Sequence, residues 1–357
     1  MRPCCRKAPA PGGRLGSCFG TILRVKVSGR REKTGPERAA PCDPRPQPQV
    51  NVALIVNPTA GSGAGGRIGP LVVQALEAQG TRAALYETRE PGDAARLAAR
   101  CRDEGVDSIG VVGGDGTLNE VVQAYVDAEG RPRPGPALAL VPAGTGSDFQ
   151  KTLGIGSRVE DAVERWLGRE PRPIDLGILQ LTAHDGKTIV RAFLNITSFG
   201  LGGLTDRIVN TGPKWIGGKA AFYVGALRAL VAYRNAPVRV RVDGEIFVEA
   251  PIVNVAIANG RYFGGGMLVA PEADPADGAF DVISMANMDK LATAALTGSI
   301  YRGTHVTRPG VTSTRGAVVE AEPLVPNAEV LIDMDGETPG RLPLVARVAR
   351  GALAMHV

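Results

Sequence analysis

The chain has 357 residues, which is enough for two domains, and 44% of them are hydrophobic, which is enough to bury real cores. Aromatic residues make up only 4%, which argues against a nucleic-acid surface built on base stacking, and no apolar run is long enough to span a membrane. Residues 1–48 carry eleven Lys/Arg and three Asp/Glu, a net charge of +8, so the remaining residues carry 30 basic and 33 acidic side chains, a net charge of −3. We therefore expect a disordered basic tail over residues 1–48, although a basic arm can also bind anionic lipid or nucleic acid.

Cysteine usage favours a reducing compartment. Four of the five cysteines lie in the tail, and only Cys101 belongs to the rest of the chain. The folded part therefore has no disulfide framework. The apolar segment 18–27 is short and is interrupted by Arg24 and Lys26, so we expect no signal peptide and a cytoplasmic protein.

Residues 49–171 alternate between strand and helix patterns. Apolar strand patterns occupy residues 50–56, 81–88, 108–112 and 137–141. Helical patterns occupy residues 68–79, 93–102, 117–127 and 158–167, and a glycine-rich loop covers residues 60–66. Strands that are joined through helices form a parallel sheet with helices on both faces. We therefore predict an α/β domain with a parallel sheet over residues 49–171.

The pattern changes near residue 172. Strands separated by turn signals are predicted at residues 172–181, 188–197, 238–242, 246–258, 280–285, 317–321 and 328–333. Only residues 218–234 and 289–299 have a helical pattern. We therefore predict a second, mainly antiparallel β domain over residues 172–340, and the cleft between two domains is a natural place for two substrates to meet.

The segment 111–121 reads VVGGDGTLNEV and is the most informative stretch of the chain. An apolar strand ends at Gly113 and Gly114, and the turn that follows contains Asp115, Gly116 and Thr117. The glycines let backbone amides approach an anion closely, and the N-terminus of the next helix, which Thr117 can cap, favours phosphate. Asp115 would repel a phosphate unless a cation lay between them, so a metal–nucleotide complex is the simplest interpretation. The alternative is a glycine-rich turn with a capping aspartate.

Two further loops follow predicted strands of the same sheet. Residues 57–63 read NPTAGSG after the first strand, and residues 142–149 read PAGTGSDF after the fourth. Because the carboxyl ends of parallel strands meet at one edge of a sheet, these loops should converge on one ligand. The spacing of Gly61, Gly63 and Gly66 matches the dinucleotide fingerprint only formally, because residues 57–60 separate these glycines from the strand end. The first loop is therefore either a phosphate-contacting loop or a mobile linker.

Two acidic turns lie in the second predicted domain. Residues 271–278 read PEADPADG, and their acids and carbonyls could hold a hard cation or form an ordinary polar turn. Residues 333–337 read DMDGE, which taken alone is also ordinary hairpin chemistry.

In this order and spacing, the segments NPTAG, GGDGTLNEV, PAGTGSDF, PEADPADGAFD and DGE resemble the catalytic family of diacylglycerol kinases. The resemblance covers about residues 50–357 and is strongest to the soluble bacterial lipid kinases. GGDGT also occurs in NAD kinases, whereas the residues 119–121 that follow it are similar to the lipid-kinase form. Ser147 stands where the family usually has Asn. The resemblance implies an α/β nucleotide-binding domain and a β-sandwich lipid-binding domain, with residues 341–357 returning to the first domain.

The resemblance also implies a role for each segment. Its nucleotide site comprises Asn57, Pro58, Thr59, Gly61, Gly113, Gly114, Asp115, Gly116, Thr117, Asn119, Gly144 and Thr145. Asp274, Asp277 and Ala279 correspond to a magnesium site in which Asp274 and Ala279 supply backbone carbonyls. Glu337 corresponds to the proton acceptor, Asp335 positions Glu337 or a cation, and Asp115 completes the catalytic set. A lipid hydroxyl is a poor nucleophile, so a carboxylate that accepts its proton suits this chemistry.

These features together predict a lipid kinase that uses ATP and Mg²⁺ and converts diacylglycerol to phosphatidic acid. A sphingoid-base, ceramide or NAD kinase, and a catalytically silent nucleotide- or lipid-binding regulator, remain as alternatives. The expected partner is a membrane lipid at the bilayer surface, so a cytoplasmic protein should associate peripherally with membranes; no nucleic-acid partner is expected, and a homodimer is left open. The candidates to admit the lipid are Trp215, Ile216, Phe222 and Tyr223, unless their helix packs in the core.

Overall fold

In the computed structural model the described residues are 51–143, 147–211, 218–326 and 328–357, and the side chains of residues 210–223 are not among them. Residues 48–357 form one compact unit. Some of the predictions fall outside the described part of the chain. They concern the tail 1–48, Gly144, Thr145, Trp215, Ile216, and the side chains of Phe222 and Tyr223.

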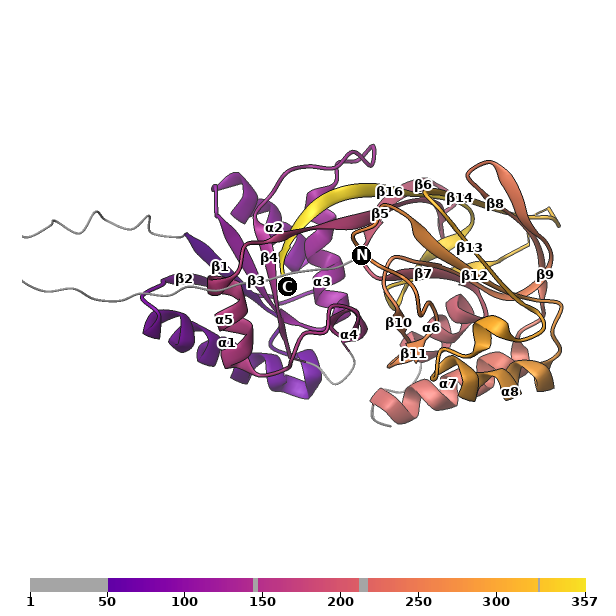
Figure 1. Cartoon of the computed structure of the whole chain (residues 1–357), viewed down its shortest axis with the longest axis horizontal. Coiled ribbons are helices and arrows are strands. Elements are labelled where there is room, and N and C mark those ends of the chain that lie inside the picture. Colours follow the sequence, from indigo (N-terminus) through magenta and orange to yellow (C-terminus); the bar gives the residue numbers. More distant parts are fainter. Residues whose placement is uncertain (1–50, 144–146, 212–217, 327) are drawn as a thin grey trace, which may run out of the picture. The chain divides into compact units, whose positions relative to one another are not determined.

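The first part of the chain forms a parallel sheet in the order β4-β3-β1-β2. Its strands are β1 (Val52–Val56), β2 (Ala83–Glu87), β3 (Ser108–Gly113) and β4 (Ala137–Pro142). Its helices are α1 (Ala60–Ala78), α2 (Asp93–Asp103), α3 (Asp115–Val122), η1 (Gln123–Tyr125), α4 (Asp148–Thr152) and α5 (Val159–Gly168). Figure 1 shows α1 and α5 on one face of this sheet and α2 and α3 on the other.

The alternation of side chains along β1 explains the two helical layers. Val52, Leu54 and Val56 are buried in the cluster that includes α1 and α5, whereas Ala53 and Ile55 are buried in the cluster that includes α2 and α3. Successive side chains of a strand point to opposite faces, so a strand that is apolar at every position must be covered on both faces. This arrangement confirms the predicted α/β class of the first part.

The second part of the chain is mainly antiparallel, as predicted. Its strands are β5 (Arg172–Ala183), β6 (Thr188–Phe193), β7 (Ile196–Gly200), β8 (Ala236–Val242), β9 (Glu245–Ala258), β10 (Tyr262–Phe263), β11 (Met267–Leu268), β12 (Phe280–Ala286), β13 (Val311–Gly316), β14 (Val318–Pro323), β15 (Leu331–Met334) and β16 (Glu337–His356). Its helices are α6 (Leu201–Thr211), α7 (Gly218–Ala232), α8 (Lys290–Ile300) and η3 (His305–Thr307).

The C-terminal strand β16 belongs to both parts of the sheet. It pairs in antiparallel fashion with β5, β14 and β15, and then in parallel with β4, where Met355 lies opposite Leu138 and His356 opposite Ala139. Figure 1 shows this strand running from the antiparallel strands to the edge of the parallel sheet. The last residues of the chain therefore lie beside β4, and the first residue of β16, Glu337, follows the β15–β16 turn.

The structure corrects the predicted helix at residues 117–127. The helix begins at Asp115 because Gly114, with φ −105° and ψ −169°, is extended and forms the N-cap, and it ends at Val122. Thr117 therefore lies in the first turn and does not cap the helix, contrary to the prediction. The predicted loop at residues 60–66 is shorter: only residues 61–63 have non-helical geometry, and the chain then continues directly as α1.

The predicted strand at residues 188–197 is divided into β6 and β7. The break falls at Leu194 and Asn195, whose backbone amides donate to the carboxylate of Asp335. A tertiary hydrogen bond therefore replaces strand pairing at this point. Helix α6 was also not predicted, because the two glycines near its start, Gly202 and Gly203, weaken the helical signal.

Candidate active site

The loops after β1 and β3 are joined by the side chain of Asn57. Its Nδ2 donates to Thr117 Oγ1 at 3.1 Å, and its Oδ1 accepts from the amide and the hydroxyl of Thr59 at 3.1 and 2.8 Å. Asn57 and Thr117 are 60 residues apart, and they meet because β1 and β3 are parallel neighbours that end at the same edge. The structure thus brings the predicted loop at residues 57–61 against the GGDGT turn.

Two glycines of the GGDGT turn border open space at the N-terminus of α3. Among the described residues, a Cβ added to Gly114 or Gly116 would meet no atom within 4 Å, whereas one added to Gly113 would lie 2.5 Å from Thr117 Oγ1. The first amides of a helix have no partner within the helix and favour anions. Gly113 is therefore required for close packing, and Gly114 and Gly116 leave room for a phosphate at the start of α3. In the adjacent loop, Gly61 has the left-handed φ of 58°.

Asp115 is the first residue of α3, and its carboxylate caps α4. It accepts from the backbone amides of Asp148 at 2.6 Å and Phe149 at 3.3 Å. Burial raises the pKa of Asp115 to about 7; the negative charges of Asp148 and Asp335 act in the same direction, and the two amide hydrogen bonds oppose it. An aspartate in a glycine-rich turn would be expected to lie exposed and to have little structural role, but Asp115 is half-buried and holds the start of another helix.

We expect Asp115 to make the nucleotide-free protein less stable as the pH rises from about 4 to about 7. The folded protein keeps this proton to a higher pH than the unfolded chain does. The stabilising contribution is therefore fully present below the unfolded pKa of 3.8 and is lost as the pH rises through about 7. Urea unfolding of the wild type and of Asp115→Asn across this range measures the effect. As the pH rises, the unfolding free energy of Asp115→Asn should increase relative to that of the wild type. A constant difference would show that Asp115 has an ordinary pKa.

Asp148 joins the loop after β4 to the second part of the chain. Its Oδ1 lies 2.6 Å from Lys151 Nζ, and its Oδ2 accepts from the backbone amide of Gly265 at 2.7 Å. Gly265 lies between β10 and β11 with φ 82°, a conformation that glycine adopts readily. The motif PAGTGSDF contains Asp148, but its partners depend on a segment more than 100 residues away. Asp148 and Lys151 are therefore site residues that sequence reasoning left without a role.

Asp335 ties α3 to the strands of the second part. Its carboxylate accepts from Asn119 Nδ2 at 2.8 Å and from the backbone amides of Leu194, Asn195 and Ile196 at 3.1, 3.3 and 2.9 Å. Desolvation raises the pKa of Asp335, and the hydrogen bonds from Asn119 and the amides oppose the shift. With four donors in place, this carboxylate holds the β15–β16 turn against α3. The side-chain amide of Asn119 thereby contacts the acidic turn.

Glu337 presents an exposed carboxylate next to this turn. Within the described ranges no hydrogen-bond donor reaches it. Partial desolvation raises the pKa of Glu337, the negative charges of Glu120 and Asp335 add to the shift, and Arg191 opposes it. A carboxylate that is free of donors and has a raised pKa is suited to accept a proton.

A buried acid pair lies behind the same turn. Asp333 accepts from Ser198 Oγ at 3.1 Å and from the amide of Gly336 at 3.0 Å, and it shares a hydrogen bond with the carboxyl group of Asp206 on α6. Burial, with the neighbouring Asp206 charge, raises the pKa of Asp333 well above its usual range. Asp333 therefore supports the backbone of the turn through the amide of Gly336. Asp206 was not predicted, because α6 itself was not.

Asp274, Asp277 and Ala279, the predicted magnesium residues, lie in a loop that is held by other contacts. Asp277 pairs with the guanidinium of Arg315 on β13. The amide of Gly278 donates to Asp175 on β5 at 2.6 Å. In the part of the chain that is described, these contacts do not involve the carboxylates at positions 115, 335 or 337. The loop is therefore anchored separately from the acidic turn.

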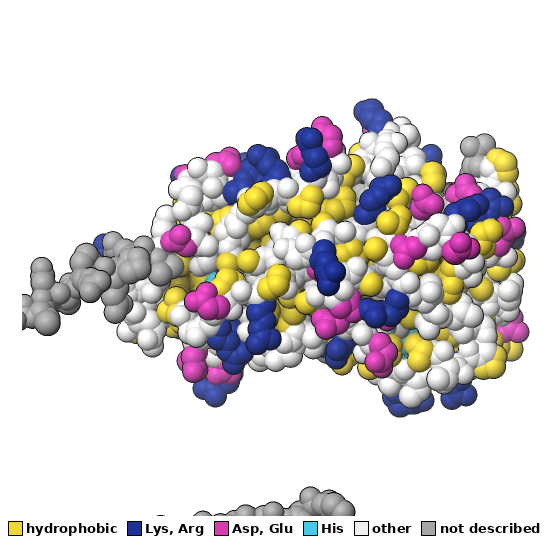
Figure 2. Space-filling model, turned by 45° about the horizontal axis from the view of Figure 1, so that its top comes forward, with side chains coloured by type: hydrophobic (Ala, Val, Ile, Leu, Met, Phe, Trp, Pro, Cys, Tyr) yellow, Lys and Arg dark blue, Asp and Glu magenta, His cyan; other side chains and the backbone are white. Residues whose placement is uncertain are grey.

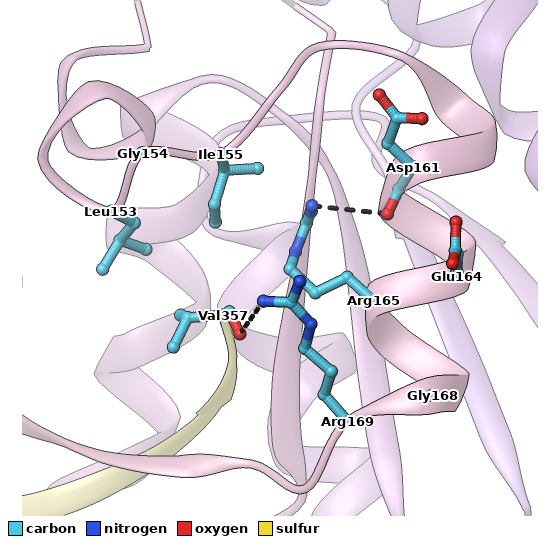
Figure 3. Close-up of a pocket in the computed structure, with 9 residues that line it drawn as sticks. All are labelled: Leu153, Gly154, Ile155, Asp161, Glu164, Arg165, Gly168, Arg169 and Val357. Atoms are coloured by element: carbon cyan, nitrogen blue, oxygen red, sulfur yellow. Dashed lines mark hydrogen bonds between the residues drawn. The ribbon is translucent and has the colours of Figure 1, made fainter.

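A cavity of about 390 Å³ lies between the end of α4, helix α5 and the last residue of the chain (Figure 3). Arg165 donates to the carbonyls of Asp161 and Leu140 at 3.4 and 3.2 Å, and Arg169 donates to the carbonyl of Val357 at 3.2 Å. None of the predicted site residues that the structure describes lines this cavity. The candidate site is therefore the edge formed by the loops after β1, β3 and β4 together with the β15–β16 turn.

Two family models match the chain. A diacylglycerol kinase catalytic domain matches residues 51–179, and a YegS C-terminal NAD kinase beta sandwich-like domain matches residues 195–357. A probable YegS-like lipid kinase of Stenotrophomonas maltophilia is 31% identical to this chain, and the match covers 78% of this chain and 88% of that protein. The chain belongs to the family of diacylglycerol kinase-like lipid kinases.

Other members of the kinase family cover the chain to a similar extent. A diacylglycerol kinase of Mycobacterium tuberculosis is 28% identical, over 81% of this chain and 89% of that protein. The crystal structure of a protein described as a diacylglycerol kinase from Bacillus anthracis is 26% identical and superimposes with a TM-score of 0.70, over 86% of this chain and 94% of that one. These findings confirm the family, the fold class and the lipid-kinase type of enzyme that the sequence predicted.

Proposed function

We propose that this kinase transfers the γ-phosphoryl group of ATP to a hydroxyl group of diacylglycerol and so forms phosphatidic acid. The observation that carries the proposal is the hydrogen bond between Asn119 Nδ2 and Asp335 Oδ2 at 2.8 Å, which joins α3 to the acidic turn. Asn119 lies one helical turn after Asp115, a rise of about 6 Å along the axis, so α3 carries the proposed phosphate opening and the contact to the acidic turn on adjacent turns. Diacylglycerol as the acceptor is supported by the relatives, several of which are diacylglycerol kinases.

The nucleotide is proposed to bind with its phosphates over Gly114 and Gly116 at the start of α3, where an added Cβ would meet no described atom within 4 Å. Asn57 keeps the neighbouring loop in place through Thr117 and Thr59. The proposed phosphate contacts come from the backbone of the turn and of the first turn of α3, which suits a site that must hold a triphosphate during transfer.

A magnesium ion that accompanies the triphosphate fits the charge of this edge. Burial and neighbouring acids raise the pKa of Asp115 to about 7, and a cation beside it would favour the ionised carboxylate. Among the described residues no group of three or more His, Cys, Asp or Glu side chains could hold a metal by itself, so phosphate oxygens would have to supply further ligands. The ion would neutralise charge on the phosphates.

Glu337 is proposed to accept the proton of the lipid hydroxyl. The lipid oxygen forms a bond to the γ-phosphorus, the bond from that phosphorus to the β–γ bridging oxygen breaks, and ADP leaves. The hydroxyl proton passes to the Glu337 carboxylate, which no protein donor occupies among the described residues. Asp335, which carries four hydrogen bonds, holds the turn that positions Glu337.

A transfer assay with a panel of acceptors tests this function. Full-length protein is incubated with γ-labelled ATP and with diacylglycerol, ceramide, sphingosine or NAD, and Glu337→Gln is purified in parallel to exclude a contaminating kinase. Label is expected in phosphatidic acid. If label appears only in another product, the acceptor is not diacylglycerol. If the protein binds nucleotide but transfers no label, the catalytically silent regulator is favoured.

The bilayer surface is the proposed partner of helix α7. Val224, Leu227 and Val231 are exposed at a spacing that places them on one face of the helix, and Leu291 on the neighbouring α8 is exposed as well. The exposed side chain of Arg228 lies on the same helix and would favour anionic lipid. No helix among the described residues is long and apolar enough to cross a membrane. An exposed apolar face can therefore reach the lipid without insertion of a spanning segment.

We expect Leu227→Glu combined with Val231→Glu to reduce binding to anionic vesicles at least tenfold, because each added carboxylate would enter the interface. Transfer to vesicle-bound diacylglycerol should fall with binding, whereas transfer to detergent-dispersed diacylglycerol should stay near that of the wild type. Leu85→Glu is the matched control, since Leu85 is an exposed apolar residue on β2. Equal loss in detergent and in vesicles would show that α7 acts in folding or catalysis instead.

The absence of a nucleic-acid partner stays a prediction, because residues 1–48, with their net charge of +8, lie outside the described part of the chain. On the face drawn in Figure 2, basic and acidic side chains are interspersed rather than gathered into one basic field. Non-specific nucleic-acid binding depends on clustered Lys and Arg.

A further inference from the structure

The loop between β11 and β12 contains the residues that the family resemblance assigns to magnesium. Mg²⁺ binds about six oxygens in near-octahedral geometry and therefore needs free oxygen atoms. Both carboxylate oxygens of Asp277 have partners here: Oδ1 accepts from the amide of Ala279 at 3.1 Å, and Oδ2 pairs with the guanidinium of Arg315. The carbonyl of Asp274 accepts from the Asp277 amide at 3.4 Å. Asp277, the one side-chain ligand of the assigned set, therefore offers no free oxygen to a magnesium ion in this structure.

The guanidinium of Arg315 stands where a cation would neutralise these acids. Arg315 on β13 lies directly opposite Asp281 on β12 in the antiparallel register. Its Nε donates to Asp281 Oδ2 at 3.3 Å, while its Nη2 pairs with Asp277 Oδ2. The planar guanidinium presents several donors in a fixed fork, so one arginine can bridge two carboxylates. The pairing of β12 with β13 thus places the positive charge of Arg315 next to the loop.

The two acids need a positive neighbour because they are poorly solvated. The side chain of Asp281 is 10% exposed and that of Asp277 is 30% exposed. Glu272 adds a further negative charge near Asp281. Burying two ionised carboxylates next to each other costs free energy unless a cation lies between them. On the other side of the loop, Arg350 packs against Gly278, where an added Cβ would lie 2.9 Å from its Nε.

We infer that the guanidinium of Arg315 replaces a bound magnesium ion in holding the loop at residues 274–279 against β12. The other anchor of the loop is Asp175, which accepts from the amides of Gly278 and Gly351 at 2.6 Å each. With both anchors in place, the loop is held without a metal. The inference goes beyond the proposed function, because it concerns the nucleotide-free fold and not the ion that accompanies ATP.

Thermal unfolding of the nucleotide-free, full-length protein tests the inference. The wild type should have the same Tm in EDTA and in millimolar Mg²⁺. Arg315→Gln removes the charge, and its Tm in EDTA should fall by roughly 5 °C. Millimolar Mg²⁺ should restore at least half of this loss, because the ion can then reach the freed oxygens of Asp277 and Asp281. Adding Asp277→Asn to Arg315→Gln should abolish the restoration, which would place the ion at this loop.

Arg239→Gln is the matched control. Arg239 also bridges two carboxylates, with Nε 2.7 Å from Glu249 and Nη1 3.0 Å from Glu322, but on the β8, β9 and β14 strands. Its loss of stability should not respond to Mg²⁺. A response of the same size would show a general ionic effect and overturn the inference.

Three further results would also overturn the inference. The first is a wild type whose Tm falls in EDTA and recovers with Mg²⁺. The second is an Arg315→Gln variant that keeps the wild-type Tm, and the third is one that loses stability without recovering in Mg²⁺.

If Arg315→Gln does not fold, Mn²⁺ binding to the nucleotide-free wild type, followed by electron paramagnetic resonance, decides the matter. A saturable site that Asp277→Asn removes contradicts the inference, and the absence of such a site supports it.

Discussion

Replacing Glu337 by glutamine should lower kcat by about 10²–10⁴-fold while ATP affinity stays close to that of the wild type. Glutamine keeps the size of the side chain and its hydrogen-bonding capacity but cannot accept the proton of the lipid hydroxyl. Glu337 is exposed and has no protein donor among the described residues, so the substitution should leave the Tm unchanged. Single-turnover transfer and equilibrium nucleotide binding measure the two effects separately.

The pH profile gives a second measure of the same role. Partial desolvation and the charges of Glu120 and Asp335 raise the pKa of Glu337, and only the ionised carboxylate can accept a proton. The kcat of the wild type should therefore rise with pH through a value above the ordinary glutamate pKa of 4.5, and this rise should be absent from Glu337→Gln. Glu120→Gln is the matched control, because Glu120 lies nearby but accepts from the amide of Ala94 at 3.2 Å. A larger loss of kcat in Glu120→Gln than in Glu337→Gln would show that Glu120, and not Glu337, accepts the proton.

Asp115→Ala is expected to abolish transfer and also to weaken the fold. The loss of transfer should exceed tenfold in kcat, about 1.4 kcal/mol in the barrier, because the carboxylate lies at the proposed triphosphate site. The loss of stability should be about 0.5–2 kcal/mol, the usual cost of removing a helix cap, because the amides of Asp148 and Phe149 lose their acceptor. Activity and urea unfolding, measured on the same preparation, test both.

Asp115→Asn separates the two roles. Asparagine can still accept from an amide of α4, but it carries no charge for a cation. We expect this variant to regain most of the unfolding free energy at neutral pH and to remain inactive. If Asp115→Asn is as active as the wild type, the charge is not needed at the triphosphate, and Asp115 acts only as a cap.

The local chemistry of the chain was sufficient to predict its class and the loops of its site. Apolar runs such as residues 108–112 end at glycines, and this pattern is set by neighbours in sequence, so it predicted parallel strands whose following loops lie at one edge. The order of the motifs also identified the family. These features are local, because a strand end, a glycine turn and a capping position each depend on a few consecutive residues.

The partners of the charged side chains were decided only by the tertiary structure. Asn119 and Asp335 are 216 residues apart, and Arg315 reaches Asp277 only because the register of β12 and β13 places it opposite Asp281. Asp115 looks like an exposed turn residue in the sequence, yet it caps α4. A carboxylate takes its pKa and its role from whichever donors and charges the fold brings within a few ångströms. Sequence spacing therefore predicted which loops meet at one edge of the sheet. The tertiary structure decided that Asp277 pairs with Arg315 and that Glu337 has no donor among the described residues.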